Sequence, residues 1–239
     1  MYTRVMGKMK NIFRHSAIID GIKEISPAKE FMPEWYKRGD NIKDGQKIIK
    51  SLPIEPGFKL CSSFSDSLLS GYMMPLSMDI AIQQTDAGPI ITWNNINLVP
   101  PIVEKRLISQ NSTLPTPMGC SPNHFAWKTQ HAINIPKGYS ALIGHPLNRF
   151  DLPFFTLTGI VDGEFDMYNG SIPVYFSSTF EGIIPAGTPI AQIILFKREN
   201  WKSKIDKGIL QKANLNHIKS ILPAYGWYKK NIWKKKSYE

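Results

Sequence analysis

The sequence has few cysteines, no long hydrophobic run and no internal repeat. Cys61 and Cys120 are the two cysteines among 239 residues, and neither has a partner at the spacing of a metal or redox motif. We therefore expect two buried, free thiols. No apolar run approaches the roughly 18–20 residues that are needed to cross a bilayer. These absences exclude a disulfide scaffold and a helical membrane protein, and they predict no membrane partner.

The beginning of the sequence lacks the features of a secretory signal. The stretch MYTRVMGKMKNIFRHSAIIDGIK is basic, but its apolar segments are too short and too interrupted for a signal peptide. Hydrophobic residues make up 42% and charged residues 20%, as in a soluble globular protein. We therefore expect a cytoplasmic location.

The charge balance is strongly basic and unevenly distributed. The formal net charge is +10, which favours anionic partners such as nucleotides, nucleic acid or phosphate-bearing ligands. A large share of it lies in the last forty residues, which end in YGWYKKNIWKKKSYE. Lysines and aromatics interleaved in this way could contact a nucleotide or a single strand, or the aromatics could dock the tail onto a neighbouring subunit while the lysines stay in water. Nucleic acid binding is the more weakly supported alternative.

Three segments of different character follow one another. Residues 1–57 are predicted to form an irregular arm with short strands, which packs on the domain that follows. Residues 58–198 contain short β-rich runs separated by Gly, Pro or Asn, as in an antiparallel β domain. Residues 199–239 carry apolar side chains at roughly helical spacing and predict a helical, basic and aromatic tail. The predicted fold class is therefore mainly β. The predicted runs are SMDIAIQQTD, PIITWNNINLV, HFAWKTQHAINI, YSALIGHP, FFTLTGIVD, SIPVYFSSTF and PIAQIILFKRE.

Four segments between residues 71 and 198 resemble the dUTP pyrophosphatase and dCTP deaminase superfamily. MPLSMDIAI, which contains Asp79, is similar to the early Pro-x-Ser-x-Asp strand, and IPKGYSALIGHPLNR to the strand that enters the phosphate-binding segment. GIVDGEF resembles the Gly-x-Ile-Asp-x-Asp-Tyr hairpin, and IPAGTPIAQIILFKRE the closing strand, with Gln192 at its glutamine. The resemblance implies a β-barrel or jelly-roll that forms homotrimers, with sites built from more than one subunit.

The resemblance also implies a set of site residues. Asp162 matches the carboxylate that orients a water for attack on the α-phosphate, and Phe165 matches the aromatic that packs on the sugar. Gly159 and Gly163 suit a hairpin that turns without blocking a pocket. The implied ligand contacts are Gly159, Ile160, Val161, Glu164, Phe165, His145, Asn148, Arg149, Gln192 and Asp79. From the residues alone, Asp162 can equally be a polar residue of a tight turn, and His145 a turn residue with local hydrogen bonds.

The departures from the family concern its catalytic parts. HPLNR stands where the family has a Ser-rich phosphate loop, and Pro146 removes a backbone donor. The deaminating Glu would fall at Tyr175, which has no carboxylate, so deamination lacks its proton carrier. A Gly-rich C-terminal arm that would cover a triphosphate is not found in the sequence. These departures leave triphosphate hydrolysis in doubt.

Three functions remain open. The first is a non-hydrolytic protein that binds a nucleotide or nucleotide-derived ligand and needs no cofactor. The frequent use of Lys, Ile and Asn suggests an AT-rich genome, which fits a phage. A phage protein would act in the cytoplasm of the host cell, and capture of a host nucleotide signal, an anti-defence role, would be a natural use of the pocket. The second is an active pyrophosphatase on a dUTP-like substrate, which would need Mg²⁺ held mostly by the phosphates. The third is a phage structural or assembly protein, against which the retained GIVD hairpin argues. No metal site of the protein itself is predicted.

Overall fold

The structure is a computed structural model in which residues 12–39, 58–94, 101–106, 113–163, 170–221 and 231–239 are described. It divides into two compact units, one with residues 1–26 and 73–198 and the other with residues 27–72 and 199–239. Each unit thus joins segments that are far apart in the sequence. The continuous division into arm, β domain and tail that the sequence suggested stays a prediction.

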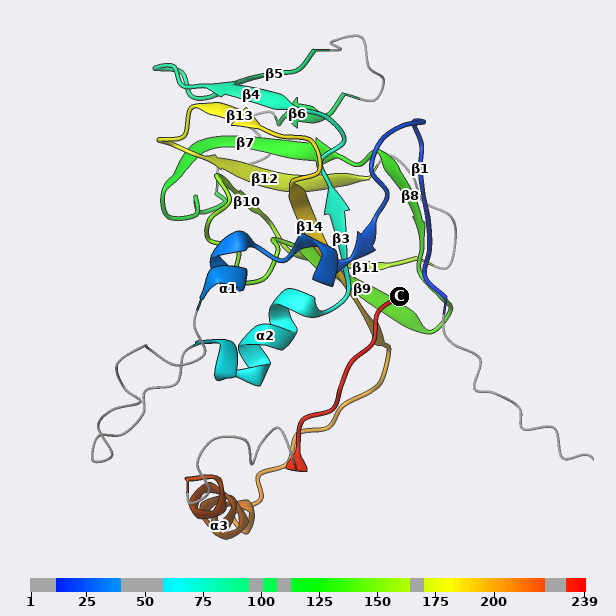
Figure 1. Ribbon diagram of the computed structural model, residues 1–239, viewed down its shortest axis with the longest axis vertical. Coiled ribbons are helices and arrows are strands. Elements are labelled where there is room, and N and C mark those ends of the chain that lie inside the picture. The colour runs from blue at the N-terminus through cyan, green and yellow to red at the C-terminus, as the bar shows by residue number, and fades with distance from the viewer. Residues whose placement is uncertain (1–11, 40–57, 95–100, 107–112, 164–169, 222–230) are drawn as a thin grey trace, which may run out of the picture. The chain divides into compact units, whose positions relative to one another are not determined.

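The described structure is mainly β, as the sequence predicted, and its strands are short (Figure 1). Each of the seven predicted β-rich runs contains at least part of a strand. The strands are β1 (Arg14–Ala17), β2 (Ser26–Pro27), β3 (Tyr72–Pro75), β4 (Ile80–Gln83), β5 (Ile90–Thr92), β6 (Val103–Lys105), β7 (Cys120–Lys128), β8 (His131–Asn134), β9 (Tyr139–Gly144), β10 (Phe154–Thr156), β11 (Gly159–Asp162), β12 (Ser171–Ser177), β13 (Gly182–Ile184) and β14 (Pro189–Lys197).

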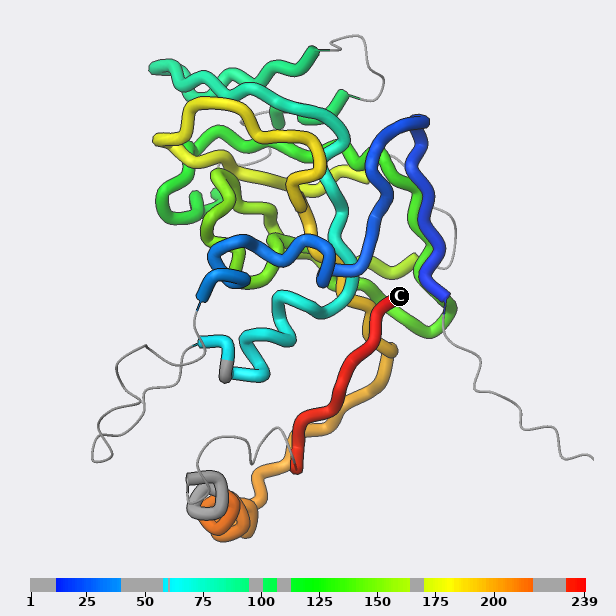
Figure 2. Tube along the Cα trace, in the orientation of Figure 1, coloured from blue at the N-terminus to red at the C-terminus, as the bar shows by residue number. Residues whose placement is uncertain are grey.

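The strands form four sheets in the part of the chain that the structure describes. Their strand orders are β1-β8, β10-β12-β7-β6, β11-β9-β14-β3-β2 and β13-β4-β5. The pairing of the blue β1 with the green β8 brings residues near the start of the described chain beside residues 131–134 (Figure 2). Strand β9 pairs antiparallel with β11 on one side and with β14 on the other. This arrangement places β11 at an edge of its sheet.

The core of the first unit forms around Trp127 of β7, whose side chain is fully buried. Its ring lies edge-on to those of Phe154 and Phe176, with centroids 5.1 and 5.2 Å away. The indole Nε1 donates to Oγ1 of the buried Thr156 over 3.1 Å, and that hydroxyl donates to the carbonyl of Ile190 over 2.7 Å. A buried polar group is costly without a partner, so this chain of hydrogen bonds ties β7, β10 and β14 together.

The helices of the described residues lie in the second unit. They are the 3₁₀ helices η1 (Ala28–Phe31) and η3 (Phe58–Leu60) and the α-helices α1 (Glu34–Arg38), α2 (Ser62–Leu69) and α3 (Ile209–Ile221). Helix α3 confirms the predicted helix after the β-rich runs. Helix α2 was not expected, because its residues lie within the segment 58–198 that was predicted to be β-rich. Its Phe64 and buried Leu68 are four residues apart and so share one face.

The end of the chain docks on the same chain's α2. The indole Nε1 of Trp233 donates to Oδ2 of Asp66 over 2.8 Å, and Lys236 forms an ion pair with the same carboxylate. The ring of Tyr238 lies edge-on to that of Tyr72, 5.9 Å between centroids. Trp233 and Tyr238 thus have partners within the chain, and docking of the tail aromatics on a neighbouring subunit stays a prediction. Tyr225, Trp227 and Tyr228 lie outside the described residues.

The two thiols differ from the prediction in their exposure. Both cysteines are free, as expected, but Cys61 is exposed and Cys120 is only half-buried. Cys61 immediately precedes α2, where its carbonyl accepts hydrogen bonds from the helix rather than its thiol entering the core. Partial burial raises the pKa of the Cys120 thiol, which therefore stays protonated near neutral pH.

Candidate functional site

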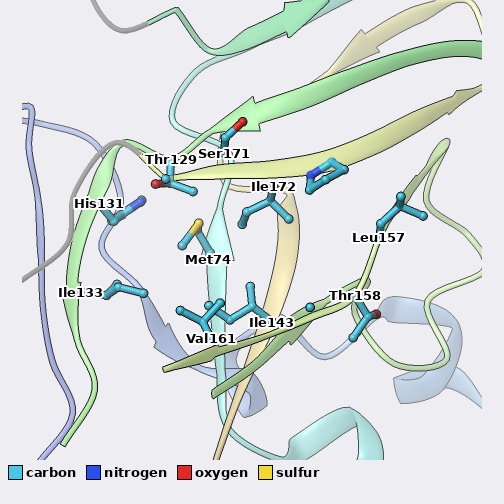
Figure 3. Close-up of a pocket in the computed structure, with 13 residues that line it drawn as sticks. Met74, Thr129, His131, Ile133, Ile143, Leu157, Thr158, Val161, Ser171 and Ile172 are labelled. Atoms are coloured by element: carbon cyan, nitrogen blue, oxygen red, sulfur yellow. The ribbon is translucent and has the colours of Figure 1, made fainter. Parts of the chain in front are cut away.

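A largely apolar pocket with a volume of about 380 Å³ opens within the first unit, beside β11 (Figure 3). Strands β3, β8, β9, β11 and β12 contribute its walls, together with the residues that connect them. The lining residues are Met74, Thr129, His131, Ile133, Ile143, Leu157, Thr158, Gly159, Val161, Gly170, Ser171, Ile172 and Pro173. Its size and mostly apolar walls with a few polar groups are typical of small-molecule sites.

Strand β11 presents one face to this pocket and has one open edge. Consecutive side chains of a strand point to opposite faces, and Gly159 and Val161 line the pocket, whereas Ile160 is 65% exposed. A Cβ added at Gly159 would meet no atom within 4 Å. Because β11 pairs with β9 on one side and has no strand on the other within the described residues, alternate backbone N–H and C=O groups point away from the sheet.

Three of the four polar side chains that line the pocket gather at one end. Figure 3 shows Thr129, His131 and Ser171 at this end and Thr158 away from it, with Met74, Ile133, Ile143 and Val161 along the apolar walls. The His131 ring is 1% exposed, and its Nε2 donates to the carbonyl of Lys23 over 2.9 Å. Its Nδ1 is buried and has no hydrogen-bond partner among the described residues. This nitrogen is therefore an unused acceptor in a residue that lines the pocket.

Asp162, the predicted catalytic carboxylate, lies next to the pocket-lining Val161 but is not itself a lining residue. It pairs in register with Ser140 of β9, and the Ser140 hydroxyl donates to its Oδ1. Ser140 is only 2% exposed, while Asp162 is exposed. The hydrogen bond gives Asp162 a partner within the sheet, whereas its role toward a ligand stays a prediction.

Hydrogen bonds between its own residues hold together the segment that was predicted to contact phosphate. His145 Nε2 donates to the carbonyl of Arg149 over 3.0 Å, and the Arg149 guanidinium contacts both carboxylate oxygens of Asp151, each over 2.9 Å. The backbone N–H of Leu147 donates to Oε1 of Gln192 over 2.8 Å. The structure therefore brings His145, Arg149 and Gln192 together through contacts within this segment and with Asp151. Their contacts with a ligand stay predictions.

The remaining predicted contacts are placed differently. Asn148, in the same segment, has a φ of 59°, a left-handed conformation that Asn tolerates better than most residues. Asp79 lies apart from the pocket, where its Oδ1 accepts a hydrogen bond from the backbone of Ala186 over 2.7 Å. Glu164 and Phe165 lie outside the described residues. All of these contacts stay predictions.

Tyr175 occupies the position that the resemblance assigns to a deaminating carboxylate. Its side chain is 1% exposed, and its ring stacks on that of His124, 4.9 Å between centroids. Burial raises the pKa of the Tyr175 hydroxyl, with a smaller contribution from Cys120. A buried, neutral phenol packed on a histidine fits a role in the core.

The buried His124 and His131 and the half-buried His145 are expected to make the stability depend on pH. Burial is the largest cause that lowers the pKa of His124, His131 and His145 below the ordinary value of a histidine, about 6.5. Between the lowered and the unfolded pKa, the unfolded chain binds protons that the folded chain does not. The free energy of unfolding is therefore expected to fall as the pH drops below about 6.5. Urea unfolding at pH 7.5 and 5.5 measures this, and equal or higher stability at pH 5.5 would contradict it.

The structure adds residues that the sequence did not single out. His131 and Ser140 belong to this group, and so does Arg106, whose Nη2 donates to Oγ of the pocket-lining Ser171 over 2.8 Å. Arg106 and Ser171 are 65 residues apart, so no local pattern could indicate the contact. Among the described residues, no group of three or more His, Cys, Asp or Glu side chains is placed to hold a metal ion. No helix of the described residues is long and apolar enough to span a membrane.

Comparisons with known proteins give distant structural similarity. No family model and no curated protein matches the sequence. A mutant dUTPase of Staphylococcus bacteriophage 80alpha, solved with dUpNHpp, is 12% identical, with 83% of this chain and 98% of that chain covered and a TM-score of 0.37. A second mutant of that dUTPase is 14% identical and covers 83% of this chain and 89% of its own, with the same TM-score.

A dUTPase from phage phi11 of S. aureus is 17% identical, with 44% of this chain and 96% of that chain covered and a TM-score of 0.27. These structures represent the family that the four sequence segments resemble. Similarity at this level assigns neither a ligand nor an activity to the chain, so the function has to be argued from the site itself.

Proposed function

We propose that this protein binds a nucleotide or nucleotide-derived small molecule in the pocket beside β11 and hydrolyses it slowly or not at all. The observation that carries the proposal is the division of β11 into two faces. Gly159 and Val161 line the pocket, whereas Asp162 is not a lining residue and accepts a hydrogen bond from Ser140. Affinity and hydrolysis would thus depend on different faces of the same strand.

The pocket suits a planar, weakly polar body such as a nucleobase. Bases are recognised by hydrogen bonds to their edges and by apolar contacts with their faces. The open edge of β11 offers backbone donors and acceptors, and Met74, Ile143 and Val161 offer apolar contacts. The absence of a side chain at Gly159 leaves room for the approach of a ring.

The groups that hydrolysis would need are engaged elsewhere. Positioning of the phosphates and the attacking water supplies a large part of the rate acceleration in such reactions. The Arg149 guanidinium is paired with Asp151, and the Gln192 amide oxygen accepts from Leu147. Any Mg²⁺ would have to arrive bound to the phosphates of a ligand, given the donors in the described residues.

The homotrimer and the capture of a host nucleotide signal stay predictions.

Mass spectrometry of the purified protein tests the proposal. The protein is denatured, and the small molecules that it releases are identified. We expect an intact nucleotide or a nucleotide derivative. Less of it should be released from a variant in which a larger side chain fills the pocket. Release of no nucleotide, combined with no measurable binding of any nucleotide from a representative panel, would overturn the proposal.

Substitutions of Asp162 separate its structural role from a catalytic one. Asparagine retains an oxygen that can accept from Ser140, so D162N is expected to change the free energy of unfolding by less than about 1 kcal/mol. Alanine leaves the buried Ser140 hydroxyl without this acceptor, and D162A is expected to cost about 1–3 kcal/mol. Both variants should bind nucleotide within about threefold of the wild type. Urea unfolding and calorimetry measure these effects; a large loss of affinity in a stable D162N would place the carboxylate at the ligand.

A further inference from the structure

Arg106 directly follows β6 and reaches the rim of the pocket. Its backbone N–H donates to the carbonyl of His124 over 2.9 Å, which fixes the start of the side chain beside β7. Its Nη2 donates to Oγ of Ser171 over 2.8 Å. Ser171 begins β12, is exposed and belongs to the lining of the pocket. The guanidinium therefore lies at the polar end of the pocket.

The charge of Arg106 has no carboxylate partner among the described residues. Its Nε is buried and has no hydrogen-bond partner there, and among the described residues its guanidinium donates to the neutral Ser171 hydroxyl. Lys128, which pairs in register with Ser171, is different because its Nζ lies 3.1 Å from Oε2 of Glu104. Of these two cations near Ser171, the lysine is neutralised within the sheet and the arginine is not.

The positive charge of Arg106 affects the pKa of a neighbouring histidine. Burial is the main cause that lowers the pKa of His124, and the positive charge of Arg106 lowers that pKa further. A cation without a nearby anion in a partly buried position is costly, and an anionic ligand offsets that cost. Arginine presents a rigid fork of N–H donors that matches the oxygens of a phosphate group.

We propose that Arg106 is the anchor for a phosphate group of the ligand, which is a nucleoside phosphate. This inference rests on the proposed function. The phosphate would lie at the rim, beside Ser171. The base and sugar would extend past Thr129 and His131 to the apolar walls and to β11. The anchor is thus outside the segment around His145 and Arg149 to which the sequence resemblance assigned phosphate contacts.

Calorimetric binding of two probes tests the anchor. The probes are dUMP and deoxyuridine, which differ by one phosphate group, and each is titrated into the wild type and into R106Q. Because hydrogen bonds to charged groups contribute more than neutral ones, R106Q is expected to lower dUMP affinity by at least about tenfold. Deoxyuridine affinity is expected to change by less than about twofold, since the nucleoside lacks the anchored group.

The matched control is K105Q, which removes the same charge from the exposed neighbour of Arg106. It should leave dUMP affinity within about twofold of the wild type. R106K keeps the charge but loses the rigid pair of guanidinium donors, so it should retain only part of the dUMP affinity. It serves as the test variant if R106Q proves unstable. Equal dUMP affinity in R106Q and the wild type, or equal losses in R106Q and K105Q, would overturn the anchor while leaving the proposed function intact. A wild type that binds neither probe nor any other nucleotide would overturn both.

Discussion

Replacement of Gly159 by valine is expected to abolish nucleotide binding while leaving the fold intact. Gly159 lines the pocket, and a Cβ at this position would meet no atom within 4 Å, so the larger side chain enters open space rather than the core. Valine is also favoured in strands. We therefore expect a change in the free energy of unfolding below about 1 kcal/mol and a loss of affinity of at least about 100-fold, because the side chain occupies the ligand's space.

The control for this experiment lies on the next residue of the same strand. Ile160 is 65% exposed and points away from the pocket-lining face, so I160V changes β11 without changing the pocket. Calorimetry and thermal unfolding of the two variants, side by side, separate an effect on the pocket from an effect on the strand. If G159V binds as tightly as I160V, the pocket beside β11 is not the nucleotide site.

The second large effect is expected in the core of the first unit. Trp127 is fully buried against two aromatic rings, so W127A should cost about 3–5 kcal/mol in the free energy of unfolding. T156V removes the hydroxyl that joins the Trp127 indole to the Ile190 carbonyl, and it should cost about 1–3 kcal/mol. T156S keeps the hydroxyl and is expected to cost less than T156V. Urea unfolding measures all three, and equal stability of T156V and T156S would contradict the role of this hydrogen-bond chain.

The sequence predicted the β-rich character because that information is local. Alternating apolar residues and the Gly, Pro or Asn between them mark strands such as β9 and β12 without knowledge of their partners. Helix α3 could be predicted from helical spacing for the same reason. Helix α2 was missed because its four serines hide the short apolar face made by Phe64 and Leu68.

The candidate site could be predicted only in part because it depends on register between distant segments. The hairpin residues Gly159 and Val161 were found through the motif, and both line the pocket. The partner of Asp162 is Ser140, 22 residues away, and only the pairing of β11 with β9 places the two together. His131 belongs to a strand that was predicted, but its position at the pocket follows from the packing of several strands. The contact between Arg106 and Ser171 has the same origin.

Nucleotide binding with little or no hydrolysis can be tested directly in one sample. The purified protein is titrated with dUTP and Mg²⁺ in a calorimeter, and pyrophosphate release is then followed in the same mixture. We expect a dissociation constant of about 1 µM or lower and little or no pyrophosphate. Turnover at or above about 1 per second, within the ordinary range of enzymes, would contradict the proposed function and identify the protein as an active pyrophosphatase.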